Sequence, residues 1–116
     1  MNSSIIEQGE LVVADILFAE QVGAKRRLAL VMSNSEYNKK SEDIIVLKVT
    51  SQGSNTEYDI NFSNENTLKK ALKKDSTIMV DFPTVIMKER IISIPDKVSR
   101  ETLVQVKQKM KELYML

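Results

Sequence analysis

Short apolar runs alternate along this chain with polar, turn-prone segments, a pattern typical of a small sheet-rich domain. Three runs stand out in the N-terminal half, over residues 9–16, 28–33 and 44–49. Their continuous apolar character predicts strands that are buried on both faces or nearly so. Between them, Gly23 is the expected turn residue of a loop over residues 20–26, and the polar segment 34–42 is predicted to be a connection.

The second half of the chain contains three more predicted strands. Residues 56–62 alternate between polar and apolar, the period of a half-buried strand. Their apolar face would comprise Tyr58, Ile60 and Phe62. Residues 76–81 are predicted to form a strand that is ended by Pro83. Residues 85–94 are predicted to form a strand that a charged tripeptide interrupts and that ends at Pro95-Asp96.

Two segments have helical spacing instead. The apolar residues of segment 64–74 are Leu68, Ala71 and Leu72. Their i, i+3, i+4 spacing predicts a short helix that Ser63 or Asn64 would cap. The C-terminal segment is the clearer helix, with Ser99 as its predicted N-cap. Its apolar stripe comprises Leu103, Val106, Met110 and Leu113.

The order of these elements predicts the fold class. No strand–helix–strand alternation is present, which argues against a doubly wound parallel sheet. The prediction is a mainly β protein of the α+β class: a small barrel-like antiparallel sheet with a short inserted helix and a C-terminal helix. A length of 116 residues without repeat or linker favours one domain, predicted over residues 9–116 after a flexible tail over residues 1–8.

Composition narrows the chemistry that the chain can perform. It contains no histidine and no cysteine, which excludes Ser-His-Asp, Cys-His and thiolate–zinc sites. No tight carboxylate cluster or glycine-rich phosphate loop is present, so we expect neither a metal nor a cofactor. The net charge is only +1, so contact with nucleic acid would require a local basic patch. No leader-like or bilayer-length apolar segment is visible, and we expect a cytoplasmic protein without membrane contact.

One reaction suits the side chains that remain, namely cleavage of RNA by its own 2′-hydroxyl group. The substrate supplies the nucleophile, and the protein must orient it and stabilise the extra negative charge on the phosphate. Arginine binds phosphate with a planar fork of donors, and a neighbouring hydroxyl can complete the anion site. Arg27 is the leading candidate because it lies where a loop meets a buried strand. Thr50 and Ser51 follow the end of another strand.

Each of these features also has an ordinary structural explanation. Arg26 and Arg27 would then be solvated charges beside a strand, and Thr50-Ser51 would bond nearby backbone in a turn. Asp15 and Asp81 are strand-end acids that could simply terminate strands. The second half also carries a dense basic patch, made of Lys69, Lys70, Lys73 and Lys74. That patch is either a solvated helix face or a surface that steers phosphates.

Several of these stretches occur together in a characteristic order. They are Gly9-Glu10-Leu11-Val12, Asp15, Gly23, Lys25-Arg26-Arg27, Ala29-Leu30-Val31, Ser33-Asn34, Val49-Thr50-Ser51, the segment 75–81 and the segment 99–103. In this order the chain resembles the PemK branch of the MazF/PemK family of ribonuclease toxins, and the likeness covers almost the whole sequence.

The resemblance implies an SH3-like barrel that forms a homodimer and cleaves single-stranded RNA, such as mRNA, without a metal. The family's catalytic arginine and threonine fall on Arg27 and Thr50. The further residues predicted to contact substrate are Ser51, Arg26, Lys25 and Glu20, with Glu20 a stand-in for the missing general base. The implied partner is an antitoxin whose extended C-terminal segment blocks the RNA groove.

Three positions depart from the family pattern. Leu28 replaces the proline that follows the arginine, Ile16-Leu17-Phe18 replaces a proline in the first loop, and Phe82 replaces a frequent basic residue. The rival hypothesis is therefore a non-catalytic binding module on the same barrel. It would sequester RNA or inhibit a protein, as the related CcdB-type toxins act on DNA gyrase. Arg27 with Thr50-Ser51 favours the nuclease, whereas the lost prolines and balanced charge favour the module.

Overall fold

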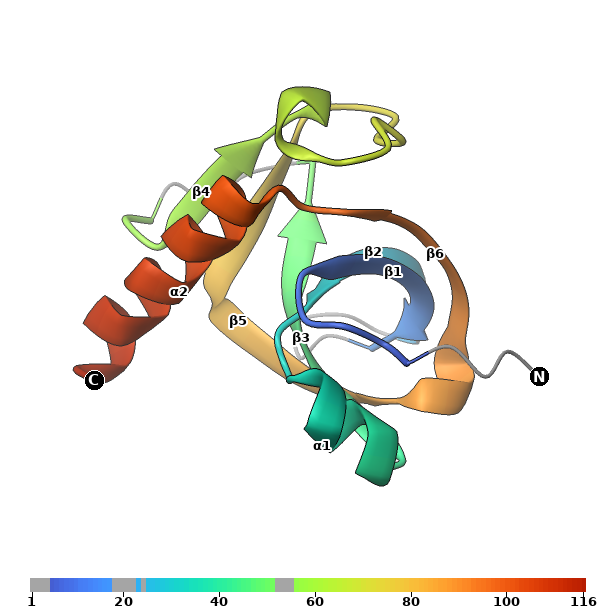
Figure 1. The fold of residues 1–116 in the computed structure, drawn as a ribbon. Helices are drawn as coiled ribbons and strands as arrows, with labels where there is room; N and C mark the ends of the chain where they lie inside the picture. Colours follow the sequence, from blue (N-terminus) through green and yellow to red (C-terminus); the bar gives the residue numbers. More distant parts are fainter. Residues whose placement is uncertain (1–4, 18–22, 24, 52–55) are drawn as a thin grey trace.

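An antiparallel sheet that curls into a barrel forms the body of the molecule (Figure 1). The computed structural model describes residues 5–17, 23, 25–51 and 56–116. The strands are β1 (Glu10–Ile16), β2 (Lys25–Val31), β3 (Asp43–Thr50), β4 (Asp59–Phe62), β5 (Ser76–Met87) and β6 (Ile91–Lys97). The helical elements are α1 (Ser35–Lys40), α2 (Arg100–Tyr114) and the 3₁₀ turns η1 (Asn64–Asn66) and η2 (Lys88–Arg90). The strand order is β4-β5-β3-β2-β1-β6, which confirms the predicted class of a mainly β fold with a C-terminal helix.

Both faces of the sheet are covered by apolar side chains. One core is built from alternate residues of the first three strands, including Val12, Ala14, Ala29, Val31, Ile44 and Val46. The intervening residues point to the opposite face, where Leu11, Leu30 and Leu47 pack with residues of β4, β5 and α2. Burial on both faces explains why these strands are almost continuously apolar in sequence, as predicted.

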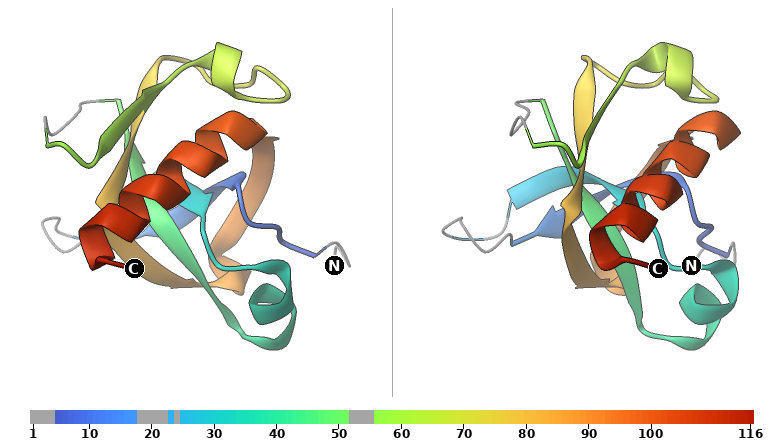
Figure 2. Two further views of the ribbon diagram at one scale, coloured as in Figure 1. Left: turned by 60° about the vertical axis from the view of Figure 1, so that its left-hand side comes forward. Right: turned by 90° about the vertical axis from the view of Figure 1, so that its left-hand side faces the viewer.

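Helix α2 closes the second core by lying across β4 and β5 (Figures 1 and 2). Ser99 caps it, because its hydroxyl oxygen accepts a hydrogen bond of 3.2 Å from the backbone N–H of Thr102. Val106 has no exposed surface, while Leu103, Met110 and Leu113 are partly buried against the same core. The predicted cap and the predicted apolar stripe are both confirmed.

The helix predicted over residues 64–74 is wrong, since only its first turn is helical, as η1. Two side chains hold the rest as an irregular loop. The amide of Asn64 accepts from the N–H of Leu72 at 2.8 Å and donates to its carbonyl at 3.0 Å. The carboxylate of Asp96 accepts from the N–H groups of Lys69 and Ala71, each at 2.8 Å. These tertiary bonds take the backbone donors that a helix would have used.

The short inserted helix is α1, within the segment predicted to be a connection. The side chain of Asn34 caps it by accepting a 2.8 Å hydrogen bond from the N–H of Tyr37. Six residues give too short an apolar pattern to be recognised from sequence. The capping residue Asn34 was the signal in the sequence that could have indicated this helix.

Both proline-based strand ends are also wrong, because β5 continues through Pro83 and β6 through Pro95. Each proline lies where the regular pairing of strands is interrupted, so no backbone N–H is required there for a hydrogen bond between strands. Pro83 is beside the register shift between Leu47 and Lys48, beyond the part of β5 that pairs with β4. Pro95 is in an edge strand that pairs only with β1, within a shifted stretch of that ladder.

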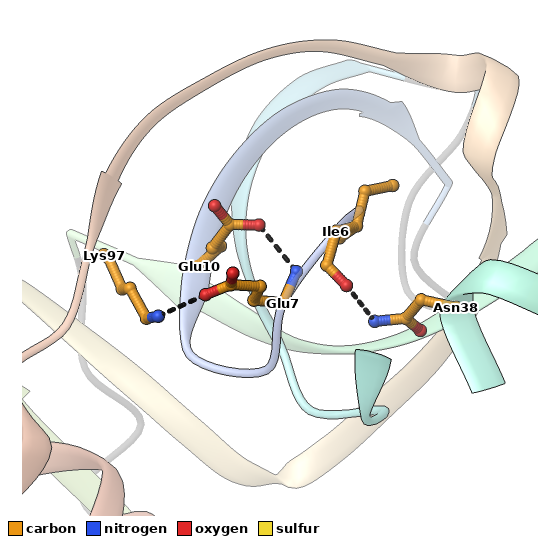
Figure 3. Close-up of polar contacts among 5 residues, drawn as sticks. All are labelled: Ile6, Glu7, Glu10, Asn38 and Lys97. Atoms are coloured by element: carbon orange, nitrogen blue, oxygen red, sulfur yellow. Dashed lines mark hydrogen bonds and ion pairs between the residues drawn. The ribbon is translucent and has the colours of Figure 1, made fainter. Parts of the chain in front are cut away.

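Residues 5–8, placed by the sequence in an N-terminal tail, are joined to the barrel by side-chain contacts (Figure 3). The amide of Asn38 donates to the carbonyl of Ile6 at 2.8 Å, and Lys97 Nζ lies 2.6 Å from Glu7 Oε1. The N–H of Glu7 in turn bonds Glu10 Oε1 at 2.7 Å. This segment therefore connects β1, α1 and β6.

Candidate functional site

The two predicted catalytic residues lie near the start of β2 and at the end of β3, which are neighbouring strands. In the β2–β3 ladder, Ala29 pairs with Lys48. The ladder ends at this pair, and its register, continued by two residues on each strand, would set Arg27 opposite Thr50. Residues directly opposite in an antiparallel pair project from the same face with their Cβ atoms about 5 Å apart. Arg27 and Thr50 thus lie just beyond the end of this ladder, on the face that also carries Ala29 and Lys48.

The row continues across two more strands. Thr50 pairs with Thr77 of β5, and Thr77 pairs with Asn61 of β4. The hydroxyl of Thr77 donates a 2.8 Å hydrogen bond to Asn61 Oδ1, which orients both side chains. We call this set the polar row, defined as Arg27, Thr50, Thr77 and Asn61. It contains a guanidinium, two hydroxyls and an amide across four neighbouring strands of the sheet.

Arg27 occupies a special position within the row. It is half-buried, and among the described residues its Nε is a buried nitrogen without a hydrogen-bond partner. A buried donor that no protein group satisfies costs free energy. The guanidinium therefore has an unused donor at the row, which an anionic ligand could satisfy.

Arg26 points away from the row. Successive strand side chains alternate between faces, and Arg26 pairs with Asp15 of β1. Arg26 Nε lies 3.7 Å from Asp15 Oδ1, and both side chains are well exposed. Lys25 is two residues before Arg27, so it shares the face of the row and is exposed. Asp15 is therefore engaged in an exposed ion pair on the opposite face.

Lys48 is a second cation on the face of the row. It lies two residues before Thr50 in β3 and is half-buried. Its Nζ lies 4.6 Å from the ring centroid of Phe82, a cation–π distance. Position 82 is where the family pattern often has a basic residue, and an ammonium group from β3 lies over the phenylalanine there instead. Positive charge is thus present near Arg27 from two adjacent strands.

A polar hollow adjoins the other end of the row. Its volume is about 460 Å³. Its lining residues are Ser51, Asn61, Phe62, Ser63, Asn66, Asp75, Ser76 and Thr77. The exposed Ser51 reaches this hollow from the end of β3, next to Thr50. Hydroxyls and amides of this kind can donate to or accept from a polar ligand.

The sequence identified part of this arrangement. Glu20 lies outside the described residues, and Asp81 is exposed on β5. Sequence reasoning missed Lys48, Thr77 and Asn61. Strand alternation counted back from Thr50 would have found Lys48, whereas Thr77 and Asn61 required the pairing of β3, β5 and β4. Within the described part of the chain, no group of three or more acidic side chains could hold a metal ion.

The arrangement can bind an anion. The Arg27 fork, the hydroxyl of Thr50 and the nearby Lys48 present positive charge and donors on one face, while the buried Thr77 gives its proton to Asn61. A phosphodiester has the matching charge and geometry.

No helix among the described residues is long and apolar enough to span a membrane.

One family of known proteins matches most of the chain. Residues 7–114 match the family model described as the PemK-like, MazF-like toxin of type II toxin–antitoxin systems. A search of curated protein sequences finds no match.

Solved structures show the same fold at low sequence identity. MazF from Deinococcus radiodurans is 22% identical, with a TM-score of 0.74 over 98% of this chain and 100% of that chain. An endoribonuclease from a mycobacterial species is 12% identical, with a TM-score of 0.77 over 97% of this chain and 94% of that one. A mycobacterial endoribonuclease in complex with its cognate antitoxin is also 12% identical, with a TM-score of 0.76 and 96% of each chain covered. At these identities the likeness concerns the fold.

Proposed function

Because the chain belongs to the family of PemK-like, MazF-like toxins of type II toxin–antitoxin systems, we propose that it is a metal-independent endoribonuclease toxin. Its substrate would be single-stranded RNA such as mRNA, cleaved in the cytoplasm at preferred short sequences. The observation that carries the proposal is the polar row: the register of β2 and β3, continued two residues past their ladder, would set Arg27 opposite Thr50, and Thr77 pairs with Thr50 from β5. A binding protein that only inhibits another protein has no need of such an anion site.

In the proposed reaction the 2′-hydroxyl oxygen of the RNA attacks the adjacent phosphorus atom. The bond from phosphorus to the 5′-oxygen breaks, leaving a 2′,3′-cyclic phosphate on one product and a 5′-hydroxyl on the other. The 2′-hydroxyl loses a proton and the departing 5′-oxygen gains one, so no external nucleophile or metal is consumed. The protein must therefore stabilise a pentacoordinate phosphate with extra negative charge.

Arg27 is proposed to supply most of that stabilisation. Its guanidinium stays protonated at neutral pH and matches two phosphate oxygens with a planar fork. Its buried Nε has no protein acceptor among the described residues, so a bound phosphate oxygen would satisfy it. Because arginine holds its proton so firmly, we assign Arg27 to charge stabilisation rather than to acid catalysis.

Thr50 is proposed to position the reacting group. It stands between Arg27 and Thr77 in the row, where a hydroxyl can donate to a phosphate oxygen or accept from the 2′-hydroxyl. Lys48 adds positive charge on the same face. Ser51, beside the hollow, is proposed to contact a neighbouring nucleotide. Of the other predicted substrate contacts, Lys25 shares the face of Arg27 and Arg26 lies on the opposite face, while Glu20 lies outside the described residues.

Two protein partners belong to the proposal. One is a second copy of the chain, because family membership and exposed apolar side chains such as Val85, Met87 and Ile92 favour a homodimer. The other is a cognate antitoxin, since a mycobacterial endoribonuclease of the same fold was solved in complex with its own.

Incubation of the purified protein with a long RNA in the presence of EDTA tests the proposal. Cleavage at a few mapped sequences, with cyclic phosphate on one product and 5′-hydroxyl on the other, is the expected result. Dependence on a divalent metal, or 5′-phosphate ends, would contradict the mechanism. Absence of any cleavage would favour the non-catalytic binding module on the same barrel.

A further inference from the structure

The loop over residues 67–75 carries a dense group of positive charges outside the polar row. It contains four lysines and one aspartate, hence a net charge of +3, against +1 for the whole chain. The lysines are Lys69, Lys70, Lys73 and Lys74, all exposed. None of them forms an ion pair with another described residue. This basic loop therefore presents uncompensated positive charge to solvent.

The basic loop is held in one conformation by hydrogen bonds from its backbone to the side chains of Asp96, Asn64 and Thr67. The side chain of Asp96, only 2% exposed, accepts 2.8 Å hydrogen bonds from the N–H groups of Lys69 and Ala71. Asn64 bonds both backbone groups of Leu72, and Thr67 Oγ1 accepts from the N–H of Lys70 at 3.1 Å. Four like charges so close together repel one another, yet the fold fixes their backbone.

One residue of the basic loop has a strained backbone conformation. Lys70 has a φ of 55°, in the left-handed region that non-glycine residues seldom adopt. Such a conformation persists only where surrounding contacts over-determine it. The fold therefore specifies the conformation of the basic loop. Lysines that are only solvated would not require a fixed backbone.

The basic loop leads directly into the polar row. Lys74 is three residues before Thr77, so their Cα atoms are at most roughly 10 Å apart. Figure 1 shows the loop (yellow-green to yellow) leading into the start of β5. The polar hollow lies between the loop and the row, with Thr77 and Asn61 lining it from the row and Asn66 and Asp75 from the ends of the loop.

We propose that the basic loop is a second RNA-backbone site, which binds the phosphates of nucleotides flanking the cleavage site. The inference rests on the proposed function, because it takes single-stranded RNA as the ligand. Lysine ammonium groups bind phosphates as point charges without reading sequence. Asp75, the one carboxylate among the residues lining the hollow, repels phosphate, so the backbone passes over the lysines rather than through the hollow.

Salt-dependent RNA binding tests this site with a readout that does not require cleavage. The loop variant replaces Lys69, Lys70, Lys73 and Lys74 with Gln. The control replaces four other exposed lysines with Gln, namely Lys39, Lys40, Lys107 and Lys111. Each protein is titrated into a labelled single-stranded RNA of about fifteen nucleotides, long enough to extend past one small domain's site. Anisotropy is recorded at several salt concentrations, and thermal unfolding checks that both variants fold.

The loop variant is expected to bind at least tenfold more weakly at low salt. Its plot of log affinity against log salt should become shallower by roughly 0.7 for each phosphate that the loop no longer binds, up to about 3 in all. The control should keep the wild-type slope. Cleavage of a short oligonucleotide that spans only the mapped site should stay within about twofold of wild type for both, because neither set of changes touches the polar row.

Equal affinity and slope for the loop variant and the wild type would overturn the proposal. The proposal would also be overturned if the loop variant bound RNA like the wild type but no longer bound a poly-glutamate peptide that the wild type binds. That result would assign the loop to an acidic protein partner. Failure of the nuclease proposal has a different signature, since the wild type would then cut neither short nor long RNA.

Discussion

At the scale of single residues, strand alternation separates two adjacent arginines that look equivalent in the sequence. Arg27 faces the polar row, whereas Arg26 pairs with Asp15 on the opposite face. The sequence could predict that they diverge, because strand side chains alternate. It could not place Thr50 opposite Arg27, because that depends on the register between β2 and β3. The family resemblance singled out the pair, and the register of the neighbouring ladder, continued by two residues, is consistent with it.

Replacing Arg27 with Ala is expected to lower the rate of RNA cleavage on the order of 10²-fold or more, the scale for removing one preorganised anion donor. Arg27→Lys should recover little, since an ammonium cannot reproduce the planar fork. The matched control is Arg26→Ala, which should stay within a few-fold of wild type because its side chain faces away. Single-turnover cleavage of one mapped site measures all three. Equal losses at positions 26 and 27 would refute the assignment.

At the scale of elements, the sequence predicted the strands with continuous apolar character and the capped C-terminal helix. It failed where long-range contacts override local preference. Residues 64–74 have helical spacing, but Asp96 and Asn64 take the backbone groups of the segment. Pro83 and Pro95 looked like strand ends, but register shifts and an unpaired strand edge accommodate them. None of these contacts is visible in a local window of sequence.

Helix α2 offers a matched pair of valines for testing its packing. Val106 is fully buried, while Val104 is 58% exposed on the same helix. Val106→Asp should lower the free energy of unfolding by about 3 kcal/mol or more, because it buries an unpaired charge. Val104→Asp should change it by less than about 1 kcal/mol. Urea denaturation measures both, and similar values would contradict the packing described for α2.

Asp96 gives the anchored loop a predictable response to pH. Burial raises the pKa of its carboxyl, but hydrogen bonds from the N–H groups of Ala71, Lys69 and Lys97 outweigh burial and leave the pKa below its ordinary value of 3.8. Its contribution to stability is therefore complete above about pH 4. That contribution is lost as the pH falls through the still lower pKa of the folded protein.

Asp96→Asn is accordingly expected to cost about 2 kcal/mol of unfolding free energy at neutral pH, the scale for charged hydrogen bonds. The difference from wild type should narrow in acid below pH 4. Asp81→Asn, at an exposed position, serves as the control. Unfolding curves between neutral pH and pH 3 measure the effect, and a difference that does not depend on pH would contradict this role of the carboxylate.

At the scale of the whole molecule, the sheet has apolar cores on both faces and still leaves apolar side chains exposed around η2. A homodimer would cover such surface and is the commonest symmetric assembly. We expect sedimentation at tens of micromolar, a range in which stable dimers persist, to give twice the monomer mass. A monomer alone under those conditions would contradict the dimer. The sequence has no direct signal for this state, since exposure depends on the assembled fold.

The central claim is that the polar row cleaves RNA through the substrate's own 2′-hydroxyl. Replacing that one hydroxyl with hydrogen at a mapped cleavage site, in an otherwise unchanged RNA incubated with EDTA, tests it most directly. The substituted site should not be cut, while unsubstituted copies of the site in the same tube are cut normally. Equal cleavage of the deoxy site would show that the nucleophile comes from elsewhere and would contradict the mechanism.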